Sequence, residues 1–293
     1  MINGNYKMDF KELEYSHRAS LAPILRAKNS CLSEYSFTNA YLFRKPHNYQ
    51  VAESDGCTFL HGVTYDNKTY MMPVCPLEII PQKKLIEMGA LVNFFFPIQE
   101  EWLTFFPEDK FTYSYLDGDS DYIYLTERLA TMAGRKLAKK RNLLKQYNEG
   151  YKTEDFELTP ERFDDAKYIL DIWERDIQQA ENHGSDYAET LEALEKMTEF
   201  NLRGMISYAD DKPSGFVLGE ELNDVTFALH FAKGIREYKG IYQHLYNAFS
   251  IKLNSEYKYI NFEQDLGKDT LRQAKSTYYP DEMRKKYRVA LIK

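Results

Sequence analysis

The sequence predicts a mixed α/β protein with two domains, and three observations support this. The chain has 293 residues, about twice the length of a typical domain. Its C-terminal half alternates short apolar runs of strand character with longer runs of helical spacing. Aromatic residues make up 15% of the chain, and such rings favour half-buried strands. We therefore expect one domain over residues 1–124 and a second over residues 125–293.

The first domain is expected to combine helices with short strands joined by turns. Helices are predicted over residues 10–25, 81–91 and 97–106, the last of them stopped near Pro107. Strands are predicted over residues 50–52, 58–65, 68–73, 111–115 and 122–125. Asp66 and Asn67 are expected to form a hairpin turn.

The second domain is expected to open with one long helix. Thr126 suits the N-cap position, apolar residues recur at helical spacing up to Tyr147, and Gly150 suits the turn that ends a helix. A short strand at 156–158 and helices at 160–181 and 190–201 should follow. Strands are then predicted over 204–208, 214–221, 225–232, 257–264 and 287–292, and helices over 238–253 and 268–279.

The connections in this last stretch indicate how its strands pair. Short turns after residues 208 and 221 favour antiparallel hairpins, whereas the helix at 238–253 favours a parallel pair on either side of it. The order of elements, two helices, three strands and then alternating helices and strands, is similar to the core of the GNAT acyltransferase fold.

Composition excludes several classes of protein. The net charge is −7, so no basic field covers the whole chain and an anion site must be local. Three cysteines without a CxxC pair indicate reduced thiols in a cytoplasmic protein. The first ten residues lack a signal-peptide core, and the longest apolar stretch, 89–98, is too short to cross a bilayer.

No metal site is predicted. The histidines form no zinc-binding pattern with one another or with cysteine. The alternating acids Asp117, Asp119 and Asp121 suggest a calcium loop, but Tyr122 stands where that loop needs glycine and Arg128 where it needs an acid. We interpret this run as an acidic turn.

One segment is strongly basic within an acidic chain. Six cations lie within eleven residues, and helical spacing places Lys136 and Lys140 on one face and Arg135 and Lys139 on the next. Such a cluster can bind the phosphates of tRNA, a phospholipid headgroup or acidic side chains. It can equally be a solvated face whose charges complement a helix dipole. The members are Arg135, Lys136, Lys139, Lys140, Arg141 and Lys145.

Several motifs together resemble the C-terminal domain family of the phosphatidylglycerol lysyltransferases. They are DYIY at 121–124, the run from Leu129 to Lys136, KKRN at 139–142, FTN at 37–39, the glycine segment 215–219, INFEQDLG at 260–267, and the segment 271–275 with Tyr278 and Pro280. The resemblance implies two tandem GNAT-like domains, related to Fem-type transferases that take amino acids from aminoacyl-tRNA. Full lysyltransferases also carry a membrane flippase region, which we do not expect here.

The resemblance leaves the acceptor open between a small molecule, a peptide and a lipid headgroup, and it implies no required cofactor. GNAT proteins usually hold the CoA pyrophosphate in a Q/R-x-x-G-x-G/A loop, where backbone N–H groups meet the phosphates. The equivalent segment, Arg236 to Ile241, has one glycine, and larger residues block close approach of the backbone. Aminoacyl-tRNA is therefore the expected donor and acyl-CoA the alternative. Arg236 and Lys239 are candidate phosphate ligands.

Two residues are predicted to be catalytic. In Fem-type enzymes a lysine in a comparable segment lies near the reacting ester, which implies that Lys275 stabilises the oxyanion or holds the terminal phosphate. The alternative is a solvated lysine on an amphipathic helix. Asp265 follows a predicted strand, where open α/β sheets place ligand groups, and it can deprotonate an amine or cap the next helix. Glu263 is a lesser candidate, and His230, which alternates with apolar neighbours, is expected to be a core residue. Further substrate-binding candidates are Asn142, Asn261, Arg272 and Tyr278.

Three functions remain open from the sequence. The first is transfer of an aminoacyl group from tRNA to an amine or hydroxyl. The second is CoA-dependent N-acyl transfer. The third is binding of an anion or nucleic acid without catalysis, because no histidine or cysteine nucleophile is evident and a fold does not determine function.

Overall fold

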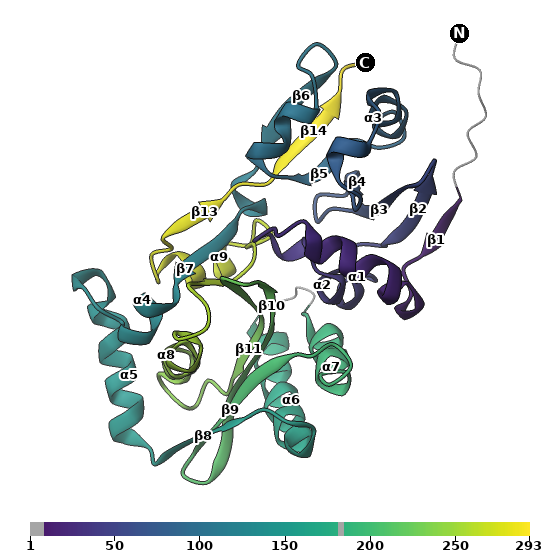
Figure 1. Ribbon diagram of the computed structural model, residues 1–293. Helices are drawn as coiled ribbons and strands as arrows, with labels where there is room; N and C mark the ends of the chain where they lie inside the picture. Colours follow the sequence, from purple (N-terminus) through teal and green to yellow (C-terminus); the bar gives the residue numbers. More distant parts are fainter. Residues whose placement is uncertain (1–8, 181–184) are drawn as a thin grey trace. The chain divides into compact units, whose positions relative to one another are not determined.

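The computed structural model describes residues 9–180 and 185–293, and the chain forms two compact units (Figure 1). Unit 1 contains the chain up to residue 121 together with residues 264–268 and 284–293. Unit 2 contains residues 122–263 and 269–283. Each unit has a seven-stranded sheet with both parallel and antiparallel pairs, so the predicted α/β class with two mixed sheets is confirmed.

The sheet of unit 1 has the order β1-β2-β3-β4-β5-β14-β6. Its strands are antiparallel to their neighbours except for β4 and β5. Buried aromatic rings, among them Phe59, Phe95, Phe106 and Phe111, form its core. The elements are β1 (Phe10–Glu12), α1 (Arg18–Ala27), α2 (Phe37–Leu42), β2 (Gln50–Ser54), β3 (Cys57–Val63), β4 (Thr69–Pro73), α3 (Gln82–Gly89), β5 (Phe94–Ile98), β6 (Phe111–Tyr115) and β14 (Tyr287–Leu291).

Two helix predictions in unit 1 are wrong in part. Residues 10–12 form strand β1, which pairs with β2, and the helix α1 begins only at Arg18. Residues 94–98 form strand β5, followed by a 3₁₀ segment at Glu100–Phe105 instead of an α-helix. All five residues of β5 are buried, so the strand is a continuous apolar run without alternation, which periodicity cannot distinguish from a helix.

The sheet of unit 2 has the order β13-β7-β12-β11-β10-β9-β8. Helix α8 packs on one face, whereas α6 covers β10 and β11 from the other (Figure 1). The elements are β7 (Asp121–Leu125), α4 (Thr126–Thr131), α5 (Ala138–Gly150), β8 (Thr153–Glu157), α6 (Phe163–Ala180), α7 (Tyr187–Glu195), β9 (Arg203–Ala209), β10 (Lys212–Asn223), β11 (Thr226–Gly234), α8 (Ile241–Leu253), β12 (Tyr259–Asn261), α9 (Asp269–Ser276) and β13 (Glu282–Arg284).

The pairing predicted for the second half is confirmed at its centre. Strands β9, β10 and β11 form two antiparallel hairpins, and β11 and β12 pair in parallel on either side of α8. The strand predicted at 287–292 is present as β14, but it pairs with β5 and β6 in the sheet of unit 1. The last residue of the helix predicted over 160–181 lies outside the described residues.

The predicted long helix after Thr126 is broken. Helix α4 ends at Thr131, Met132 adopts a left-handed conformation with φ of 49°, and Gly134 has φ of 92°. A 3₁₀ turn at Arg135–Leu137 then leads into α5. The guanidinium of Arg141 donates hydrogen bonds to the carbonyls of Met132 and Gly134 at 2.5 and 2.6 Å, and so satisfies backbone groups that the break leaves without helical partners.

Candidate functional site

In the sheet of unit 2, strands β11 and β12 pair with each other over only three residues. Residues 226–228 of β11 pair with 259–261 of β12, although β11 continues to Gly234. Beyond β12 the chain turns sharply, because Glu263 adopts a left-handed conformation with φ of 59°. Its N–H donates to Oδ1 of Asn261 at 2.6 Å. A non-glycine residue in this conformation is uncommon, and strained residues often lie at functional sites.

A β-bulge places His230 beside this turn. Leu218 pairs with Phe231 and Gly219 pairs with Leu229, so His230 is the extra residue on β11. Bulges redirect side chains and are frequent near active sites. The prediction that His230 is a satisfied core residue is consistent with its imidazole, which is fully buried.

His230 lies between two glutamates. Its Nδ1 is 2.8 Å from Oε1 of Glu263, and its Nε2 is 3.0 Å from Oε1 of Glu220. Burial opposes a charge on the imidazole, but the two carboxylates outweigh it and raise the pKa of His230 to about 10. Both ring nitrogens are therefore donors at neutral pH. We call Glu220, His230 and Glu263 the carboxylate–imidazolium cluster.

The sequence identified only part of this cluster. The sequence indicates Glu263 as a lesser candidate and His230 as a core residue, and it does not indicate Glu220. The available signal is the pair of acids Glu220 and Glu221 at the end of the mostly apolar run 214–221, since a buried acid normally requires a partner. The prediction that Glu263 lies in a strand that ends just before Asp265 is wrong, because β12 ends at Asn261.

The structure brings the basic segment 135–145 against two tyrosines that are far away in the sequence. The ammonium of Lys140 lies 4.1 Å from the ring centroid of Tyr278, and that of Lys136 lies 5.4 Å from the ring centroid of Tyr279. Burial lowers the pKa of Lys140. Tyr279 is 40% exposed, so its ring is accessible next to Lys136. We call Lys136, Lys140, Tyr278 and Tyr279 the basic–aromatic surface.

The remaining basic residues have different surroundings. Arg135, Lys139 and Asn142 are exposed, whereas Arg141 is half-buried and holds the break after α4. Lys145 lies 3.6 Å from Glu149 in an exposed ion pair. Arg141 is held by the backbone carbonyls of the break, whereas Lys136, Lys139 and Lys140 can bind an anion without giving up such a contact.

Lys275 belongs to α9, which leads into the basic–aromatic surface. Its backbone carbonyl accepts a hydrogen bond from the hydroxyl of buried Tyr124 at 2.7 Å. Its ammonium lies 5.8 Å from the ring centroid of Tyr122. Arg272 is one turn earlier on the same helix, 3.9 Å from Asp269 in a partly exposed ion pair. The DYIY motif thus fixes the backbone of the segment that carries Lys275.

The turn before α8 is closed by its own hydrogen bonds. The N–H groups of Tyr238, Lys239 and Ile241 donate to carbonyls of residues 235, 237 and 238. A Cβ on Gly240 would lie 2.4 Å from the carbonyl oxygen of Leu143, so α5 packs directly on this turn. Arg236 and Lys239 are exposed at its surface.

Asp265 belongs to unit 1 and Lys275 to unit 2. The carboxylate of Asp265 is buried and accepts the N–H of Gly267 at 2.8 Å, within its own loop. Because Gly267 precedes α9, which begins at Asp269, this contact shapes the loop and is not a cap of that helix. Asn261 is also buried, and its side chain shapes the turn at Glu263.

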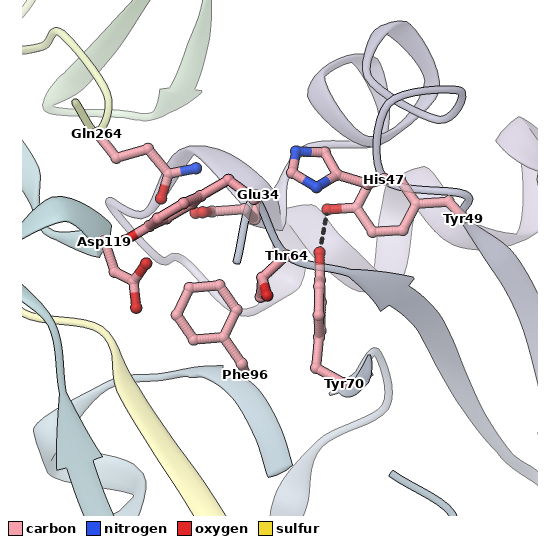
Figure 2. Close-up of a pocket in the computed structure, with 9 residues that line it drawn as sticks. Glu34, His47, Tyr49, Thr64, Tyr70, Phe96, Asp119 and Gln264 are labelled. Atoms are coloured by element: carbon pink, nitrogen blue, oxygen red, sulfur yellow. Dashed lines mark hydrogen bonds between the residues drawn. The ribbon is translucent and has the colours of Figure 1, made fainter. Parts of the chain in front are cut away.

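Unit 1 contains a small pocket that opens to solvent, is lined by polar and aromatic side chains, and has room for a group about the size of one water molecule (Figure 2). Glu34 and Asp119 are the acids that line it, and the rings of Tyr49, Tyr70 and Phe96 form part of its wall (Figure 2). The acidic run 117–121 supplies carboxylates to this region. Asp119 contacts Arg288 at 2.7 Å, and Asp121 contacts Lys286 at 2.5 Å. The run therefore binds side-chain cations, as expected for an acidic turn.

Over residues 9–180 and 185–293, no helix is both long and apolar enough to span a membrane. The same residues contain no group of three His, Cys, Asp or Glu side chains placed to hold a metal ion.

Comparison with known proteins places the chain among acyltransferase folds. A conserved protein of unknown function from Bacteroides thetaiotaomicron is 26% identical, with a TM-score of 0.81 over 98% of this chain and 100% of that one. L-PGS from Bacillus licheniformis is 14% identical, with a TM-score of 0.64 over 96% and 92% of the two chains. FemX is 8% identical, with a TM-score of 0.62 over 97% and 98%. No curated protein matches the chain.

The two distant relatives show the fold, and a family model identifies the relationship more closely. The model for the C-terminal region of phosphatidylglycerol lysyltransferase matches residues 26–290. The resemblance that the DYIY, KKRN and INFEQDLG motifs indicated is thereby confirmed. The chain belongs to the phosphatidylglycerol lysyltransferase C-terminal domain family and has the acyltransferase-like fold of that family and of FemX.

Proposed function

We propose that this protein transfers an aminoacyl group from an aminoacyl-tRNA to an amine or hydroxyl acceptor. The observation that carries the proposal is the basic–aromatic surface of unit 2, where Lys136 and Lys140 lie against Tyr279 and Tyr278. Cations that follow a phosphate backbone, together with an exposed ring on which a base can stack, suit single-stranded nucleic acid such as the acceptor end of a tRNA. The chain's family membership supports the same reaction class.

The reaction exchanges one acyl bond for another. The acceptor nitrogen or oxygen attacks the ester carbonyl, the acyl–acceptor bond forms, and the bond to the ribose oxygen of the tRNA breaks. The proton that the acceptor loses passes to a carboxylate, and the carboxylic acid so formed gives the proton to the departing ribose oxygen. We assign proton acceptance to Glu263, which the charged His230 holds in place, and oxyanion stabilisation to Lys275. Because the ester is already activated, much of the rate arises from positioning.

The turn before α8 supports tRNA over CoA as the donor. In a GNAT pyrophosphate loop the amides point to the ligand. Here the N–H groups of Tyr238, Lys239 and Ile241 bond to carbonyls of the same turn. Binding of a pyrophosphate at this place would require these hydrogen bonds to break, so acyl-CoA remains the second candidate donor.

The test measures binding of bulk aminoacylated tRNA to the purified protein across a salt series. We expect the logarithm of the binding constant to fall linearly with the logarithm of the salt concentration, by about 0.7–0.9 in slope for each neutralised phosphate. Changing the exposed pair Lys136→Glu and Lys139→Glu should reduce the slope by about 1–2 and weaken binding. The matched control is Lys83→Glu with Lys110→Glu, two exposed cations of unit 1.

Transfer is then followed as loss of labelled aminoacyl group from the tRNA in the presence of amines, hydroxyl compounds and phosphatidylglycerol vesicles. A protein that binds acetyl-CoA saturably but does not bind aminoacyl-tRNA at low salt would contradict the proposal in favour of the CoA-dependent reaction. If the Lys136/Lys139 variant and the Lys83/Lys110 control lost tRNA binding to the same extent, the assignment of the binding surface to unit 2 would be contradicted.

A further inference from the structure

The pocket of unit 1 lies next to a buried cluster of charges with an excess of carboxylates. Lys286 contacts Glu34 at 2.7 Å and Asp121 at 2.5 Å, and its side chain is fully buried. Arg288 contacts Asp119 at 2.7 Å and Asp66 at 2.8 Å. Four carboxylates therefore share two cations, and three of the four are nearly fully buried. Burying uncompensated negative charge is costly, so this arrangement favours an additional cation.

Glu34 is the carboxylate with spare capacity. It is 5% exposed, and while Oε1 binds Lys286, the buried Oε2 has no hydrogen-bond partner among the described residues. An ionised carboxylate is an acceptor only, so Oε2 requires a donor. Burial raises the pKa of Glu34 to about 7 against the opposing charge of Lys286, so a donor at Oε2 would favour its ionised form.

The remaining lining offers acceptors and aromatic faces. Nδ1 of His47 lies 2.9 Å from the carbonyl oxygen of Val63, so it carries the hydrogen. Because burial lowers the pKa of His47, the ring is neutral and Nε2 is an acceptor. Four aromatic residues, Tyr49, Tyr65, Tyr70 and Phe96, line the pocket with it, and none of the described lining residues is a lysine or arginine. The guanidinium of Arg288 lies behind this lining, 6.0 Å from the ring centroid of Tyr65 and 5.7 Å from that of Phe96. Aromatic faces attract cations, whereas an anion would meet Glu34 and Asp119.

We propose that this pocket binds the ammonium group of a small organic amine. An ammonium group supplies the missing positive charge and donates N–H bonds in several directions. A metal ion suits the pocket less well, because both oxygens of Asp119 are occupied by Arg288. The proposal concerns unit 1 alone and does not depend on acyl transfer by unit 2.

The test uses the full chain and methylammonium chloride as the probe. An NMR titration should give saturable binding with a dissociation constant on the order of 10 mM, the range for a ligand of two heavy atoms. Tetramethylammonium chloride at equal concentration is the control, because it has the same charge, no N–H donor and a bulkier shape. We expect no saturable binding from it.

Two variants locate the site. Glu34→Gln keeps the shape of the side chain but removes its charge, and it should weaken methylammonium binding at least tenfold. Glu53→Gln changes an exposed glutamate of β2 and should leave binding unchanged. A folded Glu34→Gln protein that binds methylammonium as the unmodified chain does would overturn the assignment.

A crystal structure of the unmodified chain grown with methylammonium gives a test that needs no variant. Density for the amine within hydrogen-bond distance of Oε2 of Glu34 supports the proposal. A pocket that holds an ordered water only, together with no saturable titration, would falsify it.

Discussion

At the scale of single residues, the strongest electrostatic feature of unit 2 is the charge on His230. An isolated buried histidine loses its charge because burial penalises it. Here Glu220 and Glu263 bind one ring nitrogen each and reverse that effect. Removing His230 would leave the carboxylates of Glu220 and Glu263 buried without this cation, which is destabilising. The three residues therefore depend on one another.

This arrangement predicts a specific dependence of stability on pH. The pKa of His230 is raised in the folded state to about 10, so its contribution is fully present below the ordinary value near 6.5 and is lost as pH rises through 10. The free energy of unfolding should therefore fall between pH 7 and pH 10. His230→Gln should lower it by about 3 kcal/mol at pH 7 and should remove this component of the pH dependence.

Denaturant unfolding at several pH values measures both effects. His61→Gln is the control, because burial lowers the pKa of His61, so its folded form adds no charge that is lost as pH rises from 7 to 10. Parallel stability curves for the unmodified and His230→Gln proteins would show that His230 is not charged in the folded chain.

At the scale of elements, the break between α4 and α5 determines which faces the basic residues present. Gly134 has φ of 92°, and a Cβ there would meet no atom within 4 Å. The cost of Gly134→Ala is therefore backbone strain alone, about 1–3 kcal/mol. Gly150, at the end of α5, also has open space around it but no positive φ, so Gly150→Ala should stabilise by about 0.5 kcal/mol.

The free energies of unfolding of these two variants should change in opposite directions. Equal effects would mean that α4 and α5 form the continuous helix that apolar periodicity predicted.

At the scale of the whole molecule, the chain returns to its first unit at the end. Strand β14 lies between β5 and β6, and the residues before and within it supply Lys286 and Arg288 to the buried acids. A chain that ends at Arg284 should lose this strand and leave Asp121 and Asp119 without their cations, at a cost of about 3–5 kcal/mol for each broken pair.

We expect that shortened chain to lose cooperative unfolding of unit 1 and to aggregate through the unpaired edges of β5 and β6. A chain that ends at Leu291 keeps β14 and is the matched control. Near-ultraviolet circular dichroism and thermal unfolding measure the difference, and an unchanged cooperative transition in the shorter chain would show that β14 is dispensable.

The sequence by itself determined the features that depend on neighbours along the chain. The hairpins of β9, β10 and β11 follow from short turns, the parallel pair from the intervening helix, and the family from motifs such as KKRN and INFEQDLG. The basic segment 135–145 was also visible, because its charges are close in sequence.

Only the tertiary structure decided which distant residues meet. Glu34 and Lys286 are 252 positions apart, and His230 and Glu263 are 33 apart. No local pattern encodes such pairs, since they arise when strands from separate parts of the chain join one sheet. A buried charge is stable only next to a partner of opposite charge. An acid next to an apolar run is visible in the sequence, but which cation lies beside it depends on the folded structure.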